Sequence, residues 1–115
     1  MLSKKWIAAA AVASLIAAGQ ALAADKKVVA VSIPAADHGW TAGVVYHAKA
    51  AADEINKAFP NVEVVVKTSP SAADQVSALE DLSASRKPDA LVILPYTSEE
   101  LTQPVKAIKD MGTFI

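Results

Sequence analysis

Seven consecutive residues, Pro34 to Trp40, bring together side chains of different chemical kinds. Within this segment stand a carboxylate (Asp37), an imidazole (His38), a glycine (Gly39) and the indole of Trp40. An indole face packs well against the apolar C–H groups of a sugar ring, and charged groups bind hydroxyls strongly in a dry site. We therefore expect this segment to contact a small, neutral, polyhydroxylated ligand.

Each of these side chains also has a purely structural alternative. Trp40 could pack on the helix that follows, His38 could be solvated, and Asp37 could cap that helix. Tyr96 follows the apolar run at 90–94, which predicts a strand. It could line the same site or pack at the edge of the sheet. His47 lies off the apolar stripe of the first expected helix, which favours a surface position.

The chain lacks the motifs of several other chemistries. The first loop contains neither G-x-G-x-x-G nor a P-loop, and Ser32 is not in a G-x-S-x-G context. The spacing of Asp37, His38 and His47 matches no established metal site. The absence of Cys excludes disulfides, thiol catalysis and Cys-ligated metals. We expect no catalytic residue, no metal and no cofactor, and hence a protein that is not an enzyme.

Strands and helices alternate along the chain, and these elements must position the first loop. Continuous β-branched runs predict strands buried on both faces of a parallel sheet, and Thr113 begins an expected fourth strand. This order predicts right-handed crossovers and a three-layer α/β fold with a doubly wound parallel sheet. The three complete strands are expected at 28–33, 62–68 and 90–94.

Apolar residues three and four positions apart predict three helices. Ser71 and Asp74 resemble a capping box at the start of the second helix. Thr102 as the cap of the third helix would place Pro104 in its first turn, and Gly112 would end it. The predicted stripes are Val45, Ala48, Ala52, Ile55 and Phe59; then Ala72, Val76, Leu79 and Leu82; then Leu101, Val105, Ile108 and Met111.

Ligands of open parallel sheets bind outside the carboxyl ends of the strands, where the strand order reverses. Those ends correspond here to the loops 34–40, 69–73 and 95–98. The fold therefore predicts that the first loop and Tyr96 face the same site.

The first residues have the pattern of a secretory signal peptide. Two lysines (Lys4 and Lys5) precede an apolar run, and Ala21 to Ala23 supply an A-x-A cleavage site. The run is shorter than the roughly 20 residues of a membrane span. We expect residues 1–23 to be removed between Ala23 and Ala24, leaving a soluble periplasmic protein without stable membrane insertion; an N-terminal anchoring helix is the alternative.

The charge of the remaining chain gives no electrostatic basis for nucleic-acid binding. The leader carries two of the eleven basic residues and none of the twelve acidic ones, so the segment from Ala24 has a formal net charge of −3. A basic surface is the usual signature of nucleic-acid-binding proteins.

Several segments together resemble the start of periplasmic sugar-binding proteins of the ribose/galactose-binding type, which are type I periplasmic binding proteins. They are the leader, the strand Val29–Pro34 with the aromatic first loop, Asp89–Pro95, and Ile108–Gly112. The resemblance implies two α/β lobes that close on a monosaccharide and deliver it to the membrane permease of an ABC importer. It also implies that Ser32 and the loop from Asp37 to Trp40 meet the sugar.

The chain departs from this family in two respects. Relatives often carry an Asn and paired Phe in the first loop, where this chain has Asp-His-Gly-Trp. The family's fourth strand, which usually ends in a sugar-binding Asp-Arg pair, is represented only by its first residues. Residues 24–115 therefore resemble a truncated, partial N-terminal lobe.

A second class of function remains open: an exported, hydrolase-like α/β enzyme with catalytic residues beyond Ile115. The DNA-binding repressors that share this sugar-binding core begin with a helix-turn-helix. This chain begins with an export signal instead, which excludes that reading.

Overall fold

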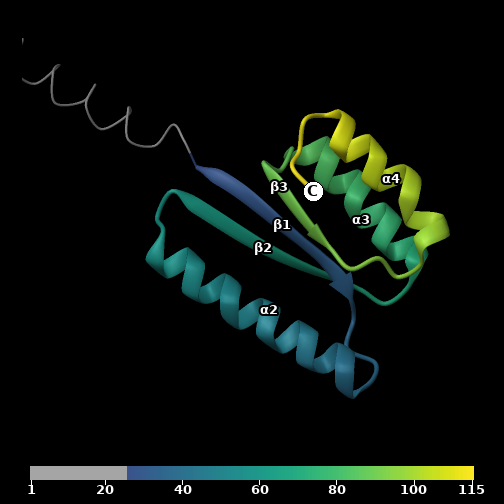
Figure 1. Ribbon diagram of the computed structural model, residues 1–115, viewed down its shortest axis with the longest axis horizontal. Coiled ribbons are helices and arrows are strands. Elements are labelled where there is room, and N and C mark those ends of the chain that lie inside the picture. The colour runs from purple at the N-terminus through teal and green to yellow at the C-terminus, as the bar shows by residue number, and fades with distance from the viewer. Residues whose placement is uncertain (1–25) are drawn as a thin grey trace, which may run out of the picture.

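Runs of β-branched residues form a parallel sheet in the computed structural model, which describes residues 26–115 (Figure 1). The leader and its expected cleavage site at Ala23 and Ala24 lie outside the described residues. The elements in chain order are β1 (Lys27–Pro34), α2 (Gly39–Ala58), β2 (Val62–Ser69), α3 (Ala72–Ser85), β3 (Ala90–Ile93) and α4 (Ser98–Asp110).

The first strand lies in the middle of the sheet, whose order is β2-β1-β3. Both of its neighbours run parallel to it: Val31 pairs with Val66 of β2 on one side and with Val92 of β3 on the other. The predicted α/β class and parallel sheet are confirmed. Because β1 is central, the chain moves from β1 to one side and then crosses back over β1 to reach β3.

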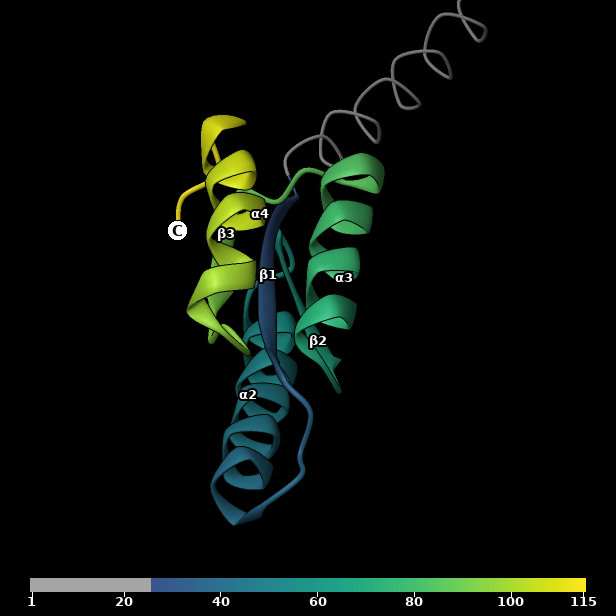
Figure 2. The ribbon, with the colours of Figure 1, turned by 90° about the vertical axis from the view of Figure 1, so that its right-hand side faces the viewer.

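This reversal distributes the helices over both faces of the sheet (Figures 1 and 2). Parallel crossovers are right-handed in nearly all proteins, so two crossovers that move in opposite directions place their helices on opposite faces. Accordingly, α2 lies on one face of the sheet, while α3 and α4 lie together on the other.

The main core lies between the sheet and the pair α3–α4. Three side chains, Leu79, Leu101 and Ile108, are only 1% exposed, and they belong to the predicted helical stripes. They pack with side chains of the sheet that point to this face. The buried members of the cluster are Ala30, Ala72, Leu79, Leu91, Leu101 and Ile108, with Val76, Leu82, Ile93 and Val105 packed against it.

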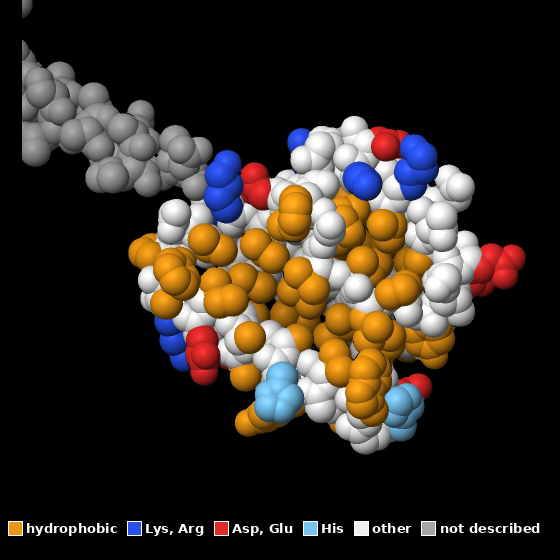
Figure 3. Space-filling model, in the orientation of Figure 1, with side chains coloured by type: hydrophobic (Ala, Val, Ile, Leu, Met, Phe, Trp, Pro, Cys, Tyr) orange, Lys and Arg blue, Asp and Glu red, His pale blue; other side chains and the backbone are white. Residues whose placement is uncertain are grey.

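The opposite face is covered less completely. Helix α2 packs on the β2 side of the sheet, and of its predicted stripe only Ala52 is buried; Phe59 is 53% exposed. Val92 of β3 is 56% exposed. On the side of the molecule shown in Figure 3, apolar side chains gather in the middle and charged ones at the margins.

The predicted N-cap is confirmed for α3 and wrong for α4. Ser71 is the N-cap of α3 and accepts a hydrogen bond from Asp74 N at 3.1 Å. Helix α4 is capped by Thr97, so Pro104 stands in its interior instead of its first turn. The missed signal is a Thr-x-x-Glu sequence: Thr97 Oγ1 donates to Glu100 Oε2 at 3.0 Å. Acidic residues in the first turn also favour this earlier start.

The last residues return to the sheet beside β3. Gly112 has φ 90°, a left-handed conformation that favours glycine, and ends α4 as predicted. Phe114 then forms a single parallel bridge with Ala90, in which Leu91 N donates to Phe114 O at 2.8 Å. The expected fourth strand is present as this one bridge.

No helix of the described residues is long and apolar enough to cross a membrane.

Ion pairs lie at the amino ends of the strands. Arg86 binds Glu63 with two hydrogen bonds, at 2.7 and 3.2 Å, which lower the pKa of Glu63 and raise that of Arg86. Asp89 accepts a hydrogen bond from Val28 N at 2.8 Å, the main reason that its pKa is lowered; Lys27, 3.5 Å away, adds to this effect.

We predict that acid destabilises the protein through these carboxylates. Because folding lowers the pKa of Asp89 and Glu63, their contribution is complete above their ordinary values of 3.8 and 4.5 and is lost as the pH falls through the lower native values. The variant Asp89→Asn should show a shallower loss of melting temperature below about pH 4 than the wild type. Calorimetric melting across this pH range measures the difference, and parallel curves for both proteins would contradict the prediction.

A second prediction concerns Gly43 in the interior of α2. A Cβ added there would meet no atom within 4 Å, and this glycine lacks a positive φ. Gly43→Ala should therefore stabilise the fold by about 0.5–1 kcal/mol, because alanine loses less backbone entropy in a helix. The matched control Ala42→Gly should destabilise it by a similar amount. Urea denaturation tests both, and a loss of stability in Gly43→Ala would refute the argument.

Candidate ligand-binding site

The strand order reverses between β1 and β3, which places a crevice at the carboxyl ends of these two strands. The chain leaves β1 toward the face of α2 and leaves β3 toward the face of α4. The loops that follow the two strands therefore diverge, as at the ligand sites of other doubly wound sheets.

A hollow of about 220 Å³ lies at this point, which we call the switch-point hollow. It is lined by Pro34, Asp37, His38, Thr41 and Tyr96. Three of the predicted site residues, Asp37, His38 and Tyr96, thus come together from two loops that are far apart in the sequence.

Thr41 fixes the shape of the first loop. Its side chain is buried, with 6% of the residue exposed, and Oγ1 donates to Asp37 Oδ1 at 2.9 Å. The same oxygen accepts the backbone N–H groups of Asp37 and His38, both at 3.2 Å. The N-cap of α2 is His38, not Asp37, so the carboxylate of Asp37 does not cap the helix.

Asp37 and His38 form a polar pair at the rim of the hollow. Asp37 Oδ1 lies 3.4 Å from His38 Nε2, and both side chains are about 60% exposed. The carboxylate accepts hydrogen bonds, and an imidazole nitrogen can donate one. Tyr96, which is 40% exposed, adds a hydroxyl and an aromatic ring. This combination can bind the hydroxyl groups and the apolar faces of a small polar ligand.

Trp40 lies beside this hollow rather than in it. It is 62% exposed and lines a second hollow with Gly39, Gly43, Val44 and His47. His47 is exposed, as predicted. Gly43, Val44 and His47 belong to α2, so the indole lies against its own helix, as the structural alternative for Trp40 expects, while most of its surface stays exposed.

Ser32 is buried, with 3% of the residue exposed, and its Oγ accepts a hydrogen bond from Gln75 Nε2 at 3.0 Å. It stands on the α3 face of β1 and does not line the switch-point hollow. The sequence analysis missed Gln75 and Thr41. Both are polar residues at inward positions of a helix, and that position is the signal that could have revealed them.

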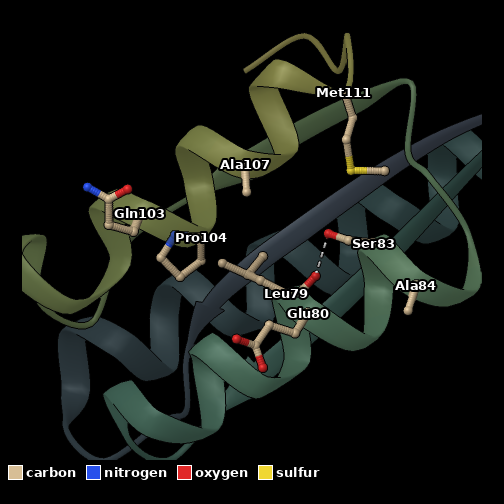
Figure 4. A pocket seen from close by; sticks show the side chains of 8 residues that line it. All are labelled: Leu79, Glu80, Ser83, Ala84, Gln103, Pro104, Ala107 and Met111. Carbon is tan, nitrogen blue, oxygen red and sulfur yellow. Dashed lines mark hydrogen bonds between the residues drawn. The ribbon is translucent and has the colours of Figure 1, made fainter.

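A larger hollow, about 620 Å³, is a groove between α3 and α4 that shares no residue with the switch-point hollow (Figure 4). Small and apolar side chains such as Ala84, Ala107 and Met111 line most of it, and Ser83 is bound to the carbonyl of Leu79. Such a groove offers few free polar groups to orient a ligand. The convergence of charged, aromatic and hydroxyl groups makes the smaller hollow the better candidate.

Within residues 26–115, no three His, Asp or Glu side chains gather as a metal site would require.

A doubly wound α/β fold with a candidate site at its switch point is the arrangement found in α/β ligand-binding domains. Comparison with known families agrees: the model of the periplasmic binding protein domain matches residues 29–115. The chain belongs to this family, whose members bind solutes. No curated protein matches the chain.

We predict that Thr41→Val loosens the first loop. The substitution keeps the shape of the side chain but removes the acceptor of two backbone N–H groups and the donor to Asp37. The loss should be about 0.5–1.5 kcal/mol of unfolding free energy. Thr102→Val is the matched control, because the hydroxyl of Thr102 bonds only to the carbonyl of Ser98 in its own helix. Equal effects of the two substitutions in urea denaturation would show that Thr41 has no special role.

Proposed function

We propose that the protein is the periplasmic solute-binding component of an ABC-type importer and that its ligand is a monosaccharide or a similar small polar molecule. It acts by binding and delivery, not by catalysis. The single observation that carries the proposal is the switch-point hollow, where Asp37, His38 and Tyr96 converge in a chain of the periplasmic binding protein family.

The groups at the hollow suit a neutral ligand rich in hydroxyls. Asp37 Oδ1 already accepts a bond from Thr41, which orients the carboxylate and leaves its second oxygen for a ligand hydroxyl. The exposed imidazole of His38 can donate to a neighbouring hydroxyl. Since hydrogen bonds to charged groups are the stronger ones, this pair would supply orientation and specificity.

Aromatic side chains flank the polar pair and would supply the apolar contacts. Trp40 exposes 62% of its surface at the start of α2, and Tyr96 exposes 40% at the end of β3. Next to Trp40, Gly39 leaves open space, since a Cβ there would meet no atom within 4 Å. A sugar ring could therefore approach the backbone and stack on the indole.

The hollow forms one wall of a site. Its volume is below the roughly 300–1,000 Å³ of complete small-molecule pockets. We propose that a second lobe closes on the exposed side of the ligand, that residues 24–115 are part of the N-terminal lobe, and that cleavage between Ala23 and Ala24 releases the protein into the periplasm. The bound form would then dock on the membrane permease of the importer.

We predict that Trp40→Ala weakens sugar binding by about 1–3 kcal/mol, the effect of losing a well-packed aromatic anchor. Asp37→Asn should also weaken binding, since it replaces a charged acceptor by a neutral one. Isothermal calorimetry of the full-length protein with D-ribose, D-galactose, D-glucose and D-xylose measures both.

The matched control for Asp37→Asn is Asp53→Asn, the same chemical change on the exposed surface of α2, away from both hollows. Its affinity should equal that of the wild type. Unchanged affinity in folded Trp40→Ala and Asp37→Asn would assign both residues a structural role. A wild-type protein that binds none of the four sugars would refute the choice of ligand.

A further inference from the structure

Gln75 is a fully buried polar residue in the middle of an apolar helix face. None of its surface is exposed, and it lies on α3 between the core residues Ala72 and Leu79. Its side-chain amide makes three hydrogen bonds: Nε2 donates to Ser32 Oγ and to Leu94 O, both at 3.0 Å, and Oε1 accepts Tyr96 N–H at 2.7 Å.

The chemistry of the partners fixes the orientation of this amide. A backbone carbonyl only accepts and a backbone N–H only donates. With Leu94 O on one side and Tyr96 N–H on the other, the two ends of the amide cannot be exchanged. Gln75 therefore has one satisfied arrangement, and it ties three partners to one geometry.

The side-chain amide of Gln75 binds the backbone just beyond the last paired residues of β1 and β3. The pairing of β1 with β3 stops at Ser32 and Ile93, and Leu94 N then donates to Ser32 O at 3.0 Å. Among the described residues, the backbone of residues 95 and 96 pairs with no strand. The amide of Gln75 carries the same donor and acceptor groups as a peptide bond and binds this backbone in place of a strand.

We propose that Gln75 is a positioning residue for the ligand site, which holds the loop after β3 so that Tyr96 lines the switch-point hollow. The effect of Gln75 on ligand affinity rests on the proposed function. Gln75 does not line the hollow and acts through Tyr96 and Ser32. Because it joins the end of β1 to the loop after β3, it keeps the two walls of the hollow at a fixed distance.

Removing the amide of Gln75 would leave backbone groups of the loop after β3 without hydrogen-bond partners. Burying a polar group without a partner is unfavourable, so Leu94 O and Tyr96 N–H would turn to water once the amide is gone. We expect this change of partners to shift the loop. Tyr96 would then leave its place opposite Asp37 and His38.

The test replaces Gln75 by Met, which is unbranched, similar in length and adaptable in cores, but forms no equivalent hydrogen bonds. Amide hydrogen exchange followed by NMR, without sugar, reports on Tyr96 N–H directly. We expect exchange at this amide to become at least about tenfold faster in Gln75→Met. The control Leu79→Val, one turn away in the same core, should leave it within about threefold of the wild type.

Ser32→Ala is the second variant, because it removes one of the three partners and leaves the core intact. It should accelerate exchange at Tyr96 less than Gln75→Met does, and it decides the question if Gln75→Met does not fold. Unchanged protection of Tyr96 in the folded variants would overturn the positioning role.

The binding measurement uses D-ribose and D-galactose with the full-length protein. The affinity of Gln75→Met for the sugar that binds should fall at least about tenfold, whereas that of Leu79→Val should stay within about twofold. Faster exchange at Tyr96 with unchanged affinity would overturn the role in binding. If the wild type binds neither sugar, the proposed function fails, while the exchange measurement still decides whether Gln75 holds the loop.

Discussion

The central place of β1 in the sheet is the constraint on which the rest of the structure depends. Because β1 is the first strand of the chain and lies between the other two, the crossover from β1 to β2 and the crossover from β2 to β3 run in opposite directions. The shared handedness of crossovers then separates α2 from α3 and α4. The same reversal opens the crevice between the loops after β1 and β3. The position of the core and the position of the candidate site thus have one cause, and neither depends on the identity of the ligand.

Side-chain amides and carboxylates complete the hydrogen bonding of this small sheet. Asn56 of α2 binds Val64 of β2 through both its donor and its acceptor, at 3.1 and 2.7 Å, and so covers part of an edge strand. Asp89 binds Val28 N at the amino end of β1, and Gln75 binds the backbone that follows β3. These contacts satisfy backbone groups that the strand pairing leaves free. No buried side-chain nitrogen or oxygen of the described residues lacks a partner.

The order and type of the elements could be predicted from the sequence because they follow from local patterns. Runs such as Val64–Val66 indicate strands, and Ser71 with Asp74 indicates the start of α3. The predicted start of α4 is wrong because the pattern Thr102 to Pro104 also fits a first turn, whereas Thr97 and Glu100 form the sequence that begins the helix. Gln75 occupies a position of the apolar stripe, but its partners are 19 to 43 residues away, and no local pattern reveals such contacts.

The two ends of the sheet differ in a way that supports a division between stability and binding. At the amino ends, opposite charges are paired with each other: Arg86 with Glu63, and Lys27 with Asp89. At the carboxyl ends, the Asp37–His38 pair remains mostly exposed, and the nearby rings of Trp40 and Tyr96 are only partly covered. In the function proposed above, a ligand covers this aromatic surface beside the polar pair. The buried amide of Gln75 binds the backbone N–H of Tyr96, so the support that we propose for the site acts on one of these two rings.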